Sequence, residues 1–133
     1  GGGSFQTSNA DIIFDGQTVG EQFGSVITSI HDADFDNVGD FWITAPYADI
    51  DGEDNGRMSF FSGVQLIGSS QILPSDATLT LTGNEGDMLG TSAMIMSDRT
   101  MDGIWEIVFS APGFDQNWLD SGATFLLSGL PNQ

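Results

Sequence analysis

Regularly spaced carboxylates are the side chains in this sequence best suited to chemistry. The segment Asp32–Asp40 reads D-x-D-x-D-x-x-x-D. Carboxylates at loop positions 1, 3, 5 and 9, with a backbone carbonyl at position 7, can surround one hard cation, and such oxygen ligands suit Ca²⁺. The spacing therefore predicts a calcium loop. Its candidate ligands are Asp32, Asp34, Asp36, the carbonyl of Val38, and Asp40.

Electrostatic repulsion inside this segment supports the same interpretation. Two carboxylates about 4 Å apart repel by about 1 kcal/mol in water, and by about 4 kcal/mol at an effective dielectric constant near 20. Four of them within nine residues should open the loop or take up protons unless a cation is bound. The alternative is a solvated acidic turn in a strongly acidic chain, and the sequence leaves it open.

A second loop repeats the spacing with weaker ligands. It carries acids at positions 1, 5 and 9 and a threonine at position 3, but Arg99 adds a positive charge inside it. One carboxylate fewer and one added cation predict a weaker site or a degenerate copy of the first loop. Its candidate ligands are Asp98, Thr100, Asp102, the carbonyl of Ile104, and Glu106.

Two further loops carry groups that suit binding or hydrolysis. The acidic cluster over residues 49–56 reads as a polar hairpin with Asp-Gly and Asn-Gly turns or as another cation site, and Asp49, Asp51 and Asp54 are candidate acids for a hydrolase. Trp118 lies in a loop, where an indole can stack on a sugar or bind a partner, or can pack under neighbouring strands.

Composition excludes several classes of function. The chain has 133 residues, 19 acidic and two basic side chains, a formal net charge of −17, one histidine and no cysteine. So few cations argue against nucleic-acid binding and against docking on anionic lipid. Zinc sites, disulfides and cysteine nucleophiles lack their residues. No apolar run approaches the roughly 20 residues of a membrane helix and no leader is recognisable; if the protein is secreted, the sequence is its mature form.

The elements that must position these loops are short strands. Glycine and proline interrupt the chain too often for long helices, and apolar or alternating runs bounded by Gly, Asp, Asn and Pro have strand length. The pattern predicts an all-β protein. Strands are expected at about 10–15, 23–30, 41–45, 57–62, 77–82, 89–96, 104–110 and 123–128.

An internal repeat organises these strands. A shift of 66 residues aligns Gly20–Gly63 with Gly86–Gly129 without a gap, and a shift of 67 aligns Ala10–Gly16 with Ala77–Gly83. Most identical positions are Gly, Asp, Ala or Pro, whereas core positions are similar only in kind, as expected for two copies of one backbone with different packing. The expected segments are an N-terminal extension (1–9), a spare outer strand (10–16), a complete unit (20–83), a unit lacking its outer strand (86–129) and a tail (130–133).

The ordered motifs of both units resemble the FG-GAP repeat, the blade of integrin-alpha-type β-propellers. The first unit carries Phe23-Gly24, the Asp-rich loop and Thr44-Ala45-Pro46, and the second carries Leu89-Gly90 and Ser110-Ala111-Pro112. Leu89 stands where the family has Phe, and Thr or Ser where its name has Gly. The resemblance covers about residues 10–129. It implies four-stranded antiparallel blades and calcium held in the loop after the first strand of each blade.

Two blades cannot close a propeller, which needs roughly four to eight. The spare strand therefore predicts head-to-tail assembly, in which the N-terminal strand of one chain completes the second blade of its neighbour and forms a ring or a fibre. The alternative is that the chain is a fragment of a longer propeller. The expected function is a non-enzymatic, extracellular or cell-surface calcium-binding module for adhesion or surface structure. The main alternative is a lectin-like propeller module that binds a glycan or a cell-surface protein through Trp118. A hydrolase on the same scaffold is the third alternative.

Overall fold

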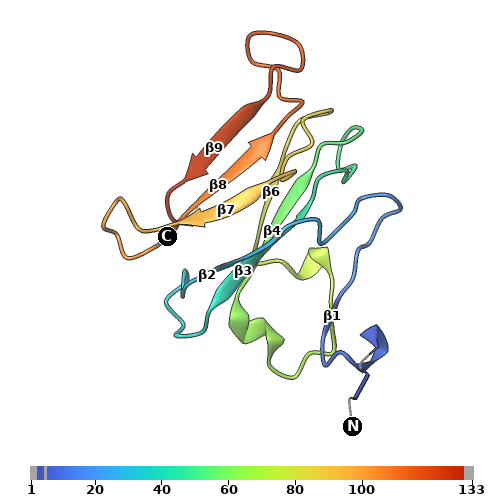
Figure 1. Ribbon diagram of the computed structural model, residues 1–133, viewed down its shortest axis with the longest axis vertical. Helices are drawn as coiled ribbons and strands as arrows, with labels where there is room; N and C mark the ends of the chain where they lie inside the picture. The colour runs from blue at the N-terminus through green and yellow to red at the C-terminus, as the bar shows by residue number, and fades with distance from the viewer. Residues whose placement is uncertain (1–2, 5, 131–133) are drawn as a thin grey trace.

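The computed structural model describes residues 3–4 and 6–130, and its fold is all-β, as the sequence predicts (Figure 1). The strands are β1 (Ile13–Phe14), β2 (Ile27–Ile30), β3 (Asp40–Ala45), β4 (Arg57–Phe61), β5 (Gln71–Ile72), β6 (Leu79–Thr82), β7 (Ala93–Met96), β8 (Glu106–Ala111) and β9 (Ala123–Leu127). Three short 3₁₀ helices, which the sequence pattern does not predict, are η1 (Thr7–Asn9), η2 (Gly63–Leu66) and η3 (Pro74–Asp76).

The first sheet contains four antiparallel strands in the order β2-β3-β4-β6. Its two central strands are almost entirely buried, with apolar side chains on both faces. Trp42 and Phe60 lie on one face, whereas Phe41 and Phe61 lie on the other, because successive side chains of a strand alternate. A sheet with two apolar faces must be covered on both sides.

The second sheet contains the antiparallel strands β7, β8 and β9 in that order. Its register repeats that of the first sheet: Ala111 pairs with Ala123 as Ala45 pairs with Arg57. Among the described residues no strand pairs with the outer edge of β9, whereas the corresponding edge of β4 pairs with β6.

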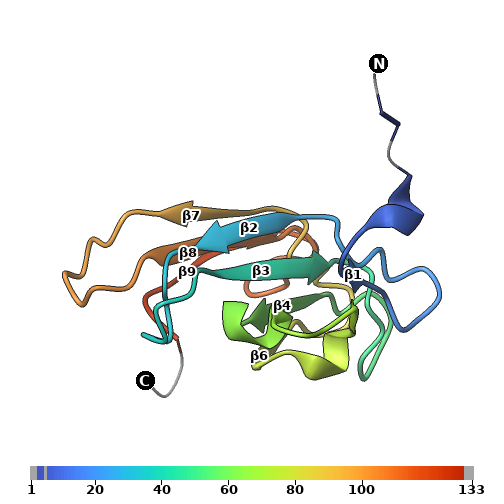
Figure 2. The same ribbon diagram turned by 90° about the horizontal axis from the view of Figure 1, so that it is seen from below.

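The two sheets share one hydrophobic core. The first sheet contributes Trp42, Met58 and Phe60, and the second contributes Ile107 and Phe109. Figures 1 and 2 both place the second sheet on one side of the first sheet and β1 on the other. The described residues form these two packed sheets and a small two-stranded sheet of β1 and β5, and no closed ring, so the propeller itself stays a prediction.

The second face of the first sheet is covered by the start of the chain. Phe14 packs edge-on against Phe41 and Phe61, with ring centroids 5.2 and 5.5 Å apart. Only Ile13 and Phe14 of the strand expected over 10–16 are in strand conformation, and they pair in parallel with β5 of the same chain. The sequence pattern missed this pairing because β5 is only two residues long.

The observed strands are shorter than several of the expected ranges. Residues 23–26 and 90–92, expected in strands, form turns and bends that lead into β2 and β7, and Leu89 makes an isolated parallel bridge with Gly56. The expected extension (1–9) and tail (130–133) lie partly outside the described residues. No helix in the described part of the chain is both long and apolar enough to cross a bilayer.

Candidate metal centre

The predicted calcium loop joins β2 to β3. Ile30 and Asp40 form the last residue pair of the hairpin, and the Asp40 N–H donates to the His31 carbonyl at 3.4 Å. Phe35 and Asn37 adopt left-handed backbone conformations, with φ of 62° and 70°. Asn tolerates this conformation better than most residues, and the two left-handed residues coil the loop back on itself.

This coiling brings three of the predicted ligands together. Carboxylate oxygens of Asp32, Asp34 and Asp40 all lie within 4.8 Å of one another. Asp32 Oδ2 accepts the Asn37 N–H at 2.8 Å, but Asp32 Oδ1 is buried and has no hydrogen-bond partner. Because a buried carboxylate oxygen without a donor is costly, this orphaned atom fits a site that is completed by a cation.

Asp40 ties the cluster to the rest of the sheet. Its buried carboxylate accepts the Ala33 N–H at 2.7 Å through one oxygen and the Gly63 N–H at 2.9 Å through the other. Burial, followed by the charges of Asp34 and Asp36, raises the pKa of Asp40, although the two N–H donors act in the opposite direction. A bound cation would favour the ionised form, since it neutralises these charges.

The other two predicted ligands of the first loop have different roles. Asp36 lies outside the group of three, because one of its oxygens accepts the Val38 N–H at 2.7 Å and the other accepts the Ser62 hydroxyl at 2.8 Å. Coordination by the Val38 carbonyl stays a prediction. Ser62, which the sequence analysis did not single out, links this loop to the end of β4.

The second acidic loop has no comparable cluster among the described residues. Its carboxylates instead accept hydrogen bonds from the loop's own backbone. Asp98 accepts from Met101 and Gly103, Asp102 accepts from Ile104, and the buried Glu106 accepts from Arg99 and Thr100. The loop is therefore closed by its own amides, and calcium binding there stays a prediction.

The third acidic cluster is organised around Asn55. The buried Asn55 Oδ1 accepts the N–H groups of Ile50, Asp51 and Gly52 at 2.9, 3.3 and 3.1 Å. Asp49 caps the Asp54 N–H at 2.8 Å, and Asp51 accepts from the Asn55 side chain. These bonds suit the polar hairpin interpretation. Hydrolysis by Asp49, Asp51 or Asp54 has no support from this arrangement.

Trp118 is 79% exposed in the loop between β8 and β9. A shallow hollow beside it is lined mainly by polar side chains, Asp115, Gln116 and Asn117. The indole is therefore available to a partner.

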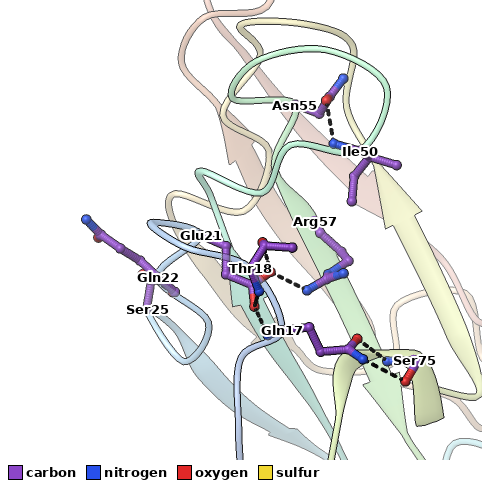
Figure 3. Close-up of polar contacts among 9 residues, drawn as sticks. All are labelled: Gln17, Thr18, Glu21, Gln22, Ser25, Ile50, Asn55, Arg57 and Ser75. Atoms are coloured by element: carbon purple, nitrogen blue, oxygen red, sulfur yellow. Dashed lines mark hydrogen bonds and ion pairs between the residues drawn. The ribbon is translucent and has the colours of Figure 1, made fainter.

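A buried ion pair supports the connection from β1 to the first sheet (Figure 3). Arg57 Nη2 donates to Glu21 Oε2 at 2.6 Å, and the same carboxylate accepts the Thr18 hydroxyl at 3.0 Å. The sequence analysis did not select this pair. Glu21 aligns with Asp87 under the 66-residue shift, and this repeated acidic position is the feature of the sequence that points to Glu21.

No known protein family matches the chain, and no curated protein is similar to it. The function is therefore inferred from the geometry and the sequence pattern.

Proposed function

We propose that this chain is a non-enzymatic, calcium-stabilised module of a β-propeller, with blades of the FG-GAP type. The observation that carries the proposal is the convergence of Asp32, Asp34 and Asp40 around a buried Asp32 oxygen that lacks a donor. Loop carboxylates with room for a backbone carbonyl and water suit Ca²⁺, whereas Mg²⁺ demands a smaller octahedral shell and keeps more of its water.

The metal has a structural role in this proposal. Asp40 is already bonded to Ala33 in the loop and to Gly63 after β4. A cation bound by Asp40, Asp32 and Asp34 would cross-link the loop between β2 and β3 to the segment that follows β4 at the same end of the first sheet. It would also remove the repulsion between the three carboxylates.

The proposed setting is the cell surface or the extracellular space, in adhesion or surface assembly. Millimolar extracellular calcium fills even a weak loop site. An acidic surface with a formal charge of −17 suits such a calcium-bearing environment. Assembly is proposed to be head-to-tail, with three chains supplying six blades or four chains supplying eight.

Calcium titration and thermal unfolding test the proposal. We expect Ca²⁺ to bind one site and, at a concentration 100 times its Kd, to stabilise the fold by about 2.7 kcal/mol. EDTA should reverse this and loosen the assembly, whereas Mg²⁺ should stabilise less. Asp32→Asn should abolish the calcium response, and Asp98→Asn at the equivalent position should retain it. No change in melting temperature between Ca²⁺ and EDTA would reject the proposal.

A second candidate is a lectin-like module that binds a glycan or a cell-surface protein. The exposed indole of Trp118, beside the polar hollow of Asp115, Gln116 and Asn117, favours it. Binding on a glycan array that Trp118→Ala abolishes, while calcium binding persists, would favour this candidate. An array with no bound glycan argues against glycan binding.

A further inference from the structure

We propose that a second copy of this chain docks on the open side of the second sheet, with its β1 beside β9 and its Val19 against Trp118. The inference rests on the head-to-tail arrangement proposed above and names the residues that form the contact. It follows from treating the junction between the two sheets of one chain as the template for the junction between two chains.

The template consists of three backbone hydrogen bonds between the first unit and the turn that starts the second. The bonds run from Gly86 N–H to the Glu53 carbonyl (2.9 Å), from Met88 N–H to the Asp54 carbonyl (2.9 Å) and from Leu89 N–H to the Asn55 carbonyl (3.1 Å). A 66-residue shift maps the donors onto Gly20, Gln22 and Phe23, and the acceptors onto Leu119, Asp120 and Ser121.

The donor turn recurs with the same backbone conformation. Gly20 and Gly86 have φ of 84° and 81°, and Gln22 and Met88 have φ of 53° and 51°. The N–H groups of Gly20, Gln22 and Phe23 nevertheless have no hydrogen-bond acceptor among the described residues. Three donors are therefore held in the bonding conformation without their acceptors.

The acceptor loop recurs in the same way. Asp54 and Asp120 both have φ of 49°, and their N–H groups are capped by Asp49 and Asp115. The carbonyls that follow Trp118, those of residues 119–121, accept no backbone N–H group in the described part of the chain. They are the free equivalents of the carbonyls that hold the second unit against the first.

The segment that contains β1 copies the segment that contains β6. Asn9 caps the Gln6 N–H at η1 (3.0 Å), as Asp76 caps the Leu73 N–H at η3 (2.8 Å). The closing glycines also have equivalent surroundings. A Cβ added at Gly16 would meet Glu21 and Phe23, and one added at Gly83 would meet their equivalents, Asp87 and Leu89. β1 therefore meets the start of the first unit in the way that β6 meets the start of the second unit.

The free edge of β1 is the one that the template requires. Ile13 and Asp15 donate to Ser70 and Ile72, so the alternation of a strand turns the N–H groups of Ile12 and Phe14 to the opposite edge. In β6 the N–H of Gly83, the equivalent of Gly16, donates to Gly56 at 3.2 Å and marks the edge that pairs with β4. β1 can thus pair with β9 of a neighbour while it remains in place on its own sheet.

Exposed apolar side chains lie where this junction places them. Trp118 corresponds to Gly52 and Val19 to Glu85. A Cβ added at Gly52 would lie only 2.8 Å from the Glu85 Cβ, closer than two Cβ atoms can approach, so the junction between chains must be slightly wider here than its template. Val19 is fully exposed, and Leu119, next to Trp118, is 83% exposed. These side chains are uncharged in a chain of net charge −17, although Asp115 and Asp120 lie in the same loop as Trp118.

The sheet faces match as well. Phe60 is fully buried by the second sheet, whereas its equivalent, Leu126, is 43% exposed. In the first unit, Gly24 lines an apolar cavity of about 310 Å³, and a Cβ added there would have no atom within 4 Å. At the equivalent glycine of the second unit, Gly90, Thr44 and Met58 of the first unit fill this space. A neighbouring copy would supply what this face lacks.

Cysteine cross-linking tests the contact, because the chain has no cysteine of its own. We expect Val19→Cys/Trp118→Cys, oxidised in calcium, to give covalent multimers on a non-reducing gel, because a junction about 1 Å wider than the template brings the two Cβ atoms to the roughly 3.8 Å of a disulfide. An equimolar mixture of the two single variants should give dimers only. The control is the double variant Met101→Cys/Trp118→Cys, in which the first cysteine stands at an exposed apolar residue of the second acidic loop. This variant should remain monomeric.

Mass photometry of the unmodified chain completes the test. We expect a complex of three or four chains, and monomers for Trp118→Glu. A stable monomer in calcium, or a cysteine pair that gives no multimers, overturns the inference. Calcium binding without cross-linking rejects only the contact, whereas cross-linking without calcium binding rejects only the metal site.

Discussion

The loops 32–40 and 98–106 follow nearly the same path but differ in their chemistry. Phe35 and Met101 both have φ of 62°, and the left-handed conformation of Asn37 recurs at Gly103. In each loop the first aspartate accepts the N–H of the sixth residue at 2.8 Å. The backbone of the two loops is therefore conserved across the repeat while the side chains diverge.

The difference lies in which groups occupy the carboxylate lone pairs. Asp32 Oδ1 has no donor, whereas Asp98 Oδ1 accepts the Met101 N–H at 2.6 Å. Glu106 is one methylene longer than Asp40 and accepts from the amides of both Arg99 and Thr100. Backbone capping and cation binding compete for the same oxygens. Both loops cap backbone amides with their carboxylates, but only the first leaves a buried oxygen of its first aspartate without a donor.

Removing the buried anchor of the first loop should have the largest effect. Asp40→Ala leaves the N–H groups of Ala33 and Gly63 without an acceptor, and we expect a loss of about 2–4 kcal/mol of unfolding free energy together with calcium binding. Urea unfolding in Ca²⁺ and in EDTA measures both effects. Glu106→Ala should lose stability equally in the two buffers. An Asp40→Ala protein as stable as the unmodified chain contradicts the anchoring role.

Removing the charge of one ligand while its hydrogen bond is kept should weaken binding only. Asp34 Oδ1 accepts the Asp36 N–H at 3.2 Å, and the amide oxygen of an asparagine can accept the same bond. For Asp34→Asn we expect a calcium Kd at least tenfold higher, about 1.4 kcal/mol, because one charge leaves the site. Stability in EDTA should change by less than about 0.5 kcal/mol. Isothermal titration calorimetry measures the affinity. Thr100→Ala, at the equivalent position, is the control, and a similar loss of affinity in that variant would mean that the two loops are not distinct.

Converting the second loop into the first tests the comparison in the opposite direction. The variant Arg99→Ala/Thr100→Asp/Glu106→Asp removes the added cation, restores the missing carboxylate and shortens the acid that caps the amides. We expect the calcium stoichiometry to rise from one to two in a titration. Thr100→Asp alone should remain at one, since Glu106 and Arg99 still oppose binding. A triple variant that binds one ion would show that side chains alone do not account for the difference.

The smallest effect is expected from the turn residue that the loops do not share. Asn37→Gly should change the unfolding free energy by less than about 0.5 kcal/mol, because Asn already tolerates a left-handed conformation. Asn37→Val should cost about 1–2 kcal/mol. Denaturant midpoints in EDTA compare the two variants. Equal midpoints would mean that the loop does not hold this conformation in solution.

Much of the fold could be predicted because turn residues and strand alternation repeat along the chain. The strand over 77–82 alternates strictly, and β6 occupies 79–82. β5 and the 3₁₀ helices were missed, since two or three residues carry too little periodicity. At the site, spacing predicted the convergence of Asp32, Asp34 and Asp40. It could not predict that Asp36 turns to Ser62, because that contact depends on where β4 ends.

The residue at the position of Asn55 determines how firmly the hairpin tip of each unit is held. In the first unit its amide ties together three backbone N–H groups and the Gly83 carbonyl, but the equivalent residue of the second unit is Ser121, whose hydroxyl is too short to do the same. In the proposed assembly the interface between two chains is accordingly less stable than the interface between the two units of one chain. Dilution should separate the chains as intact two-sheet bodies long before either sheet melts.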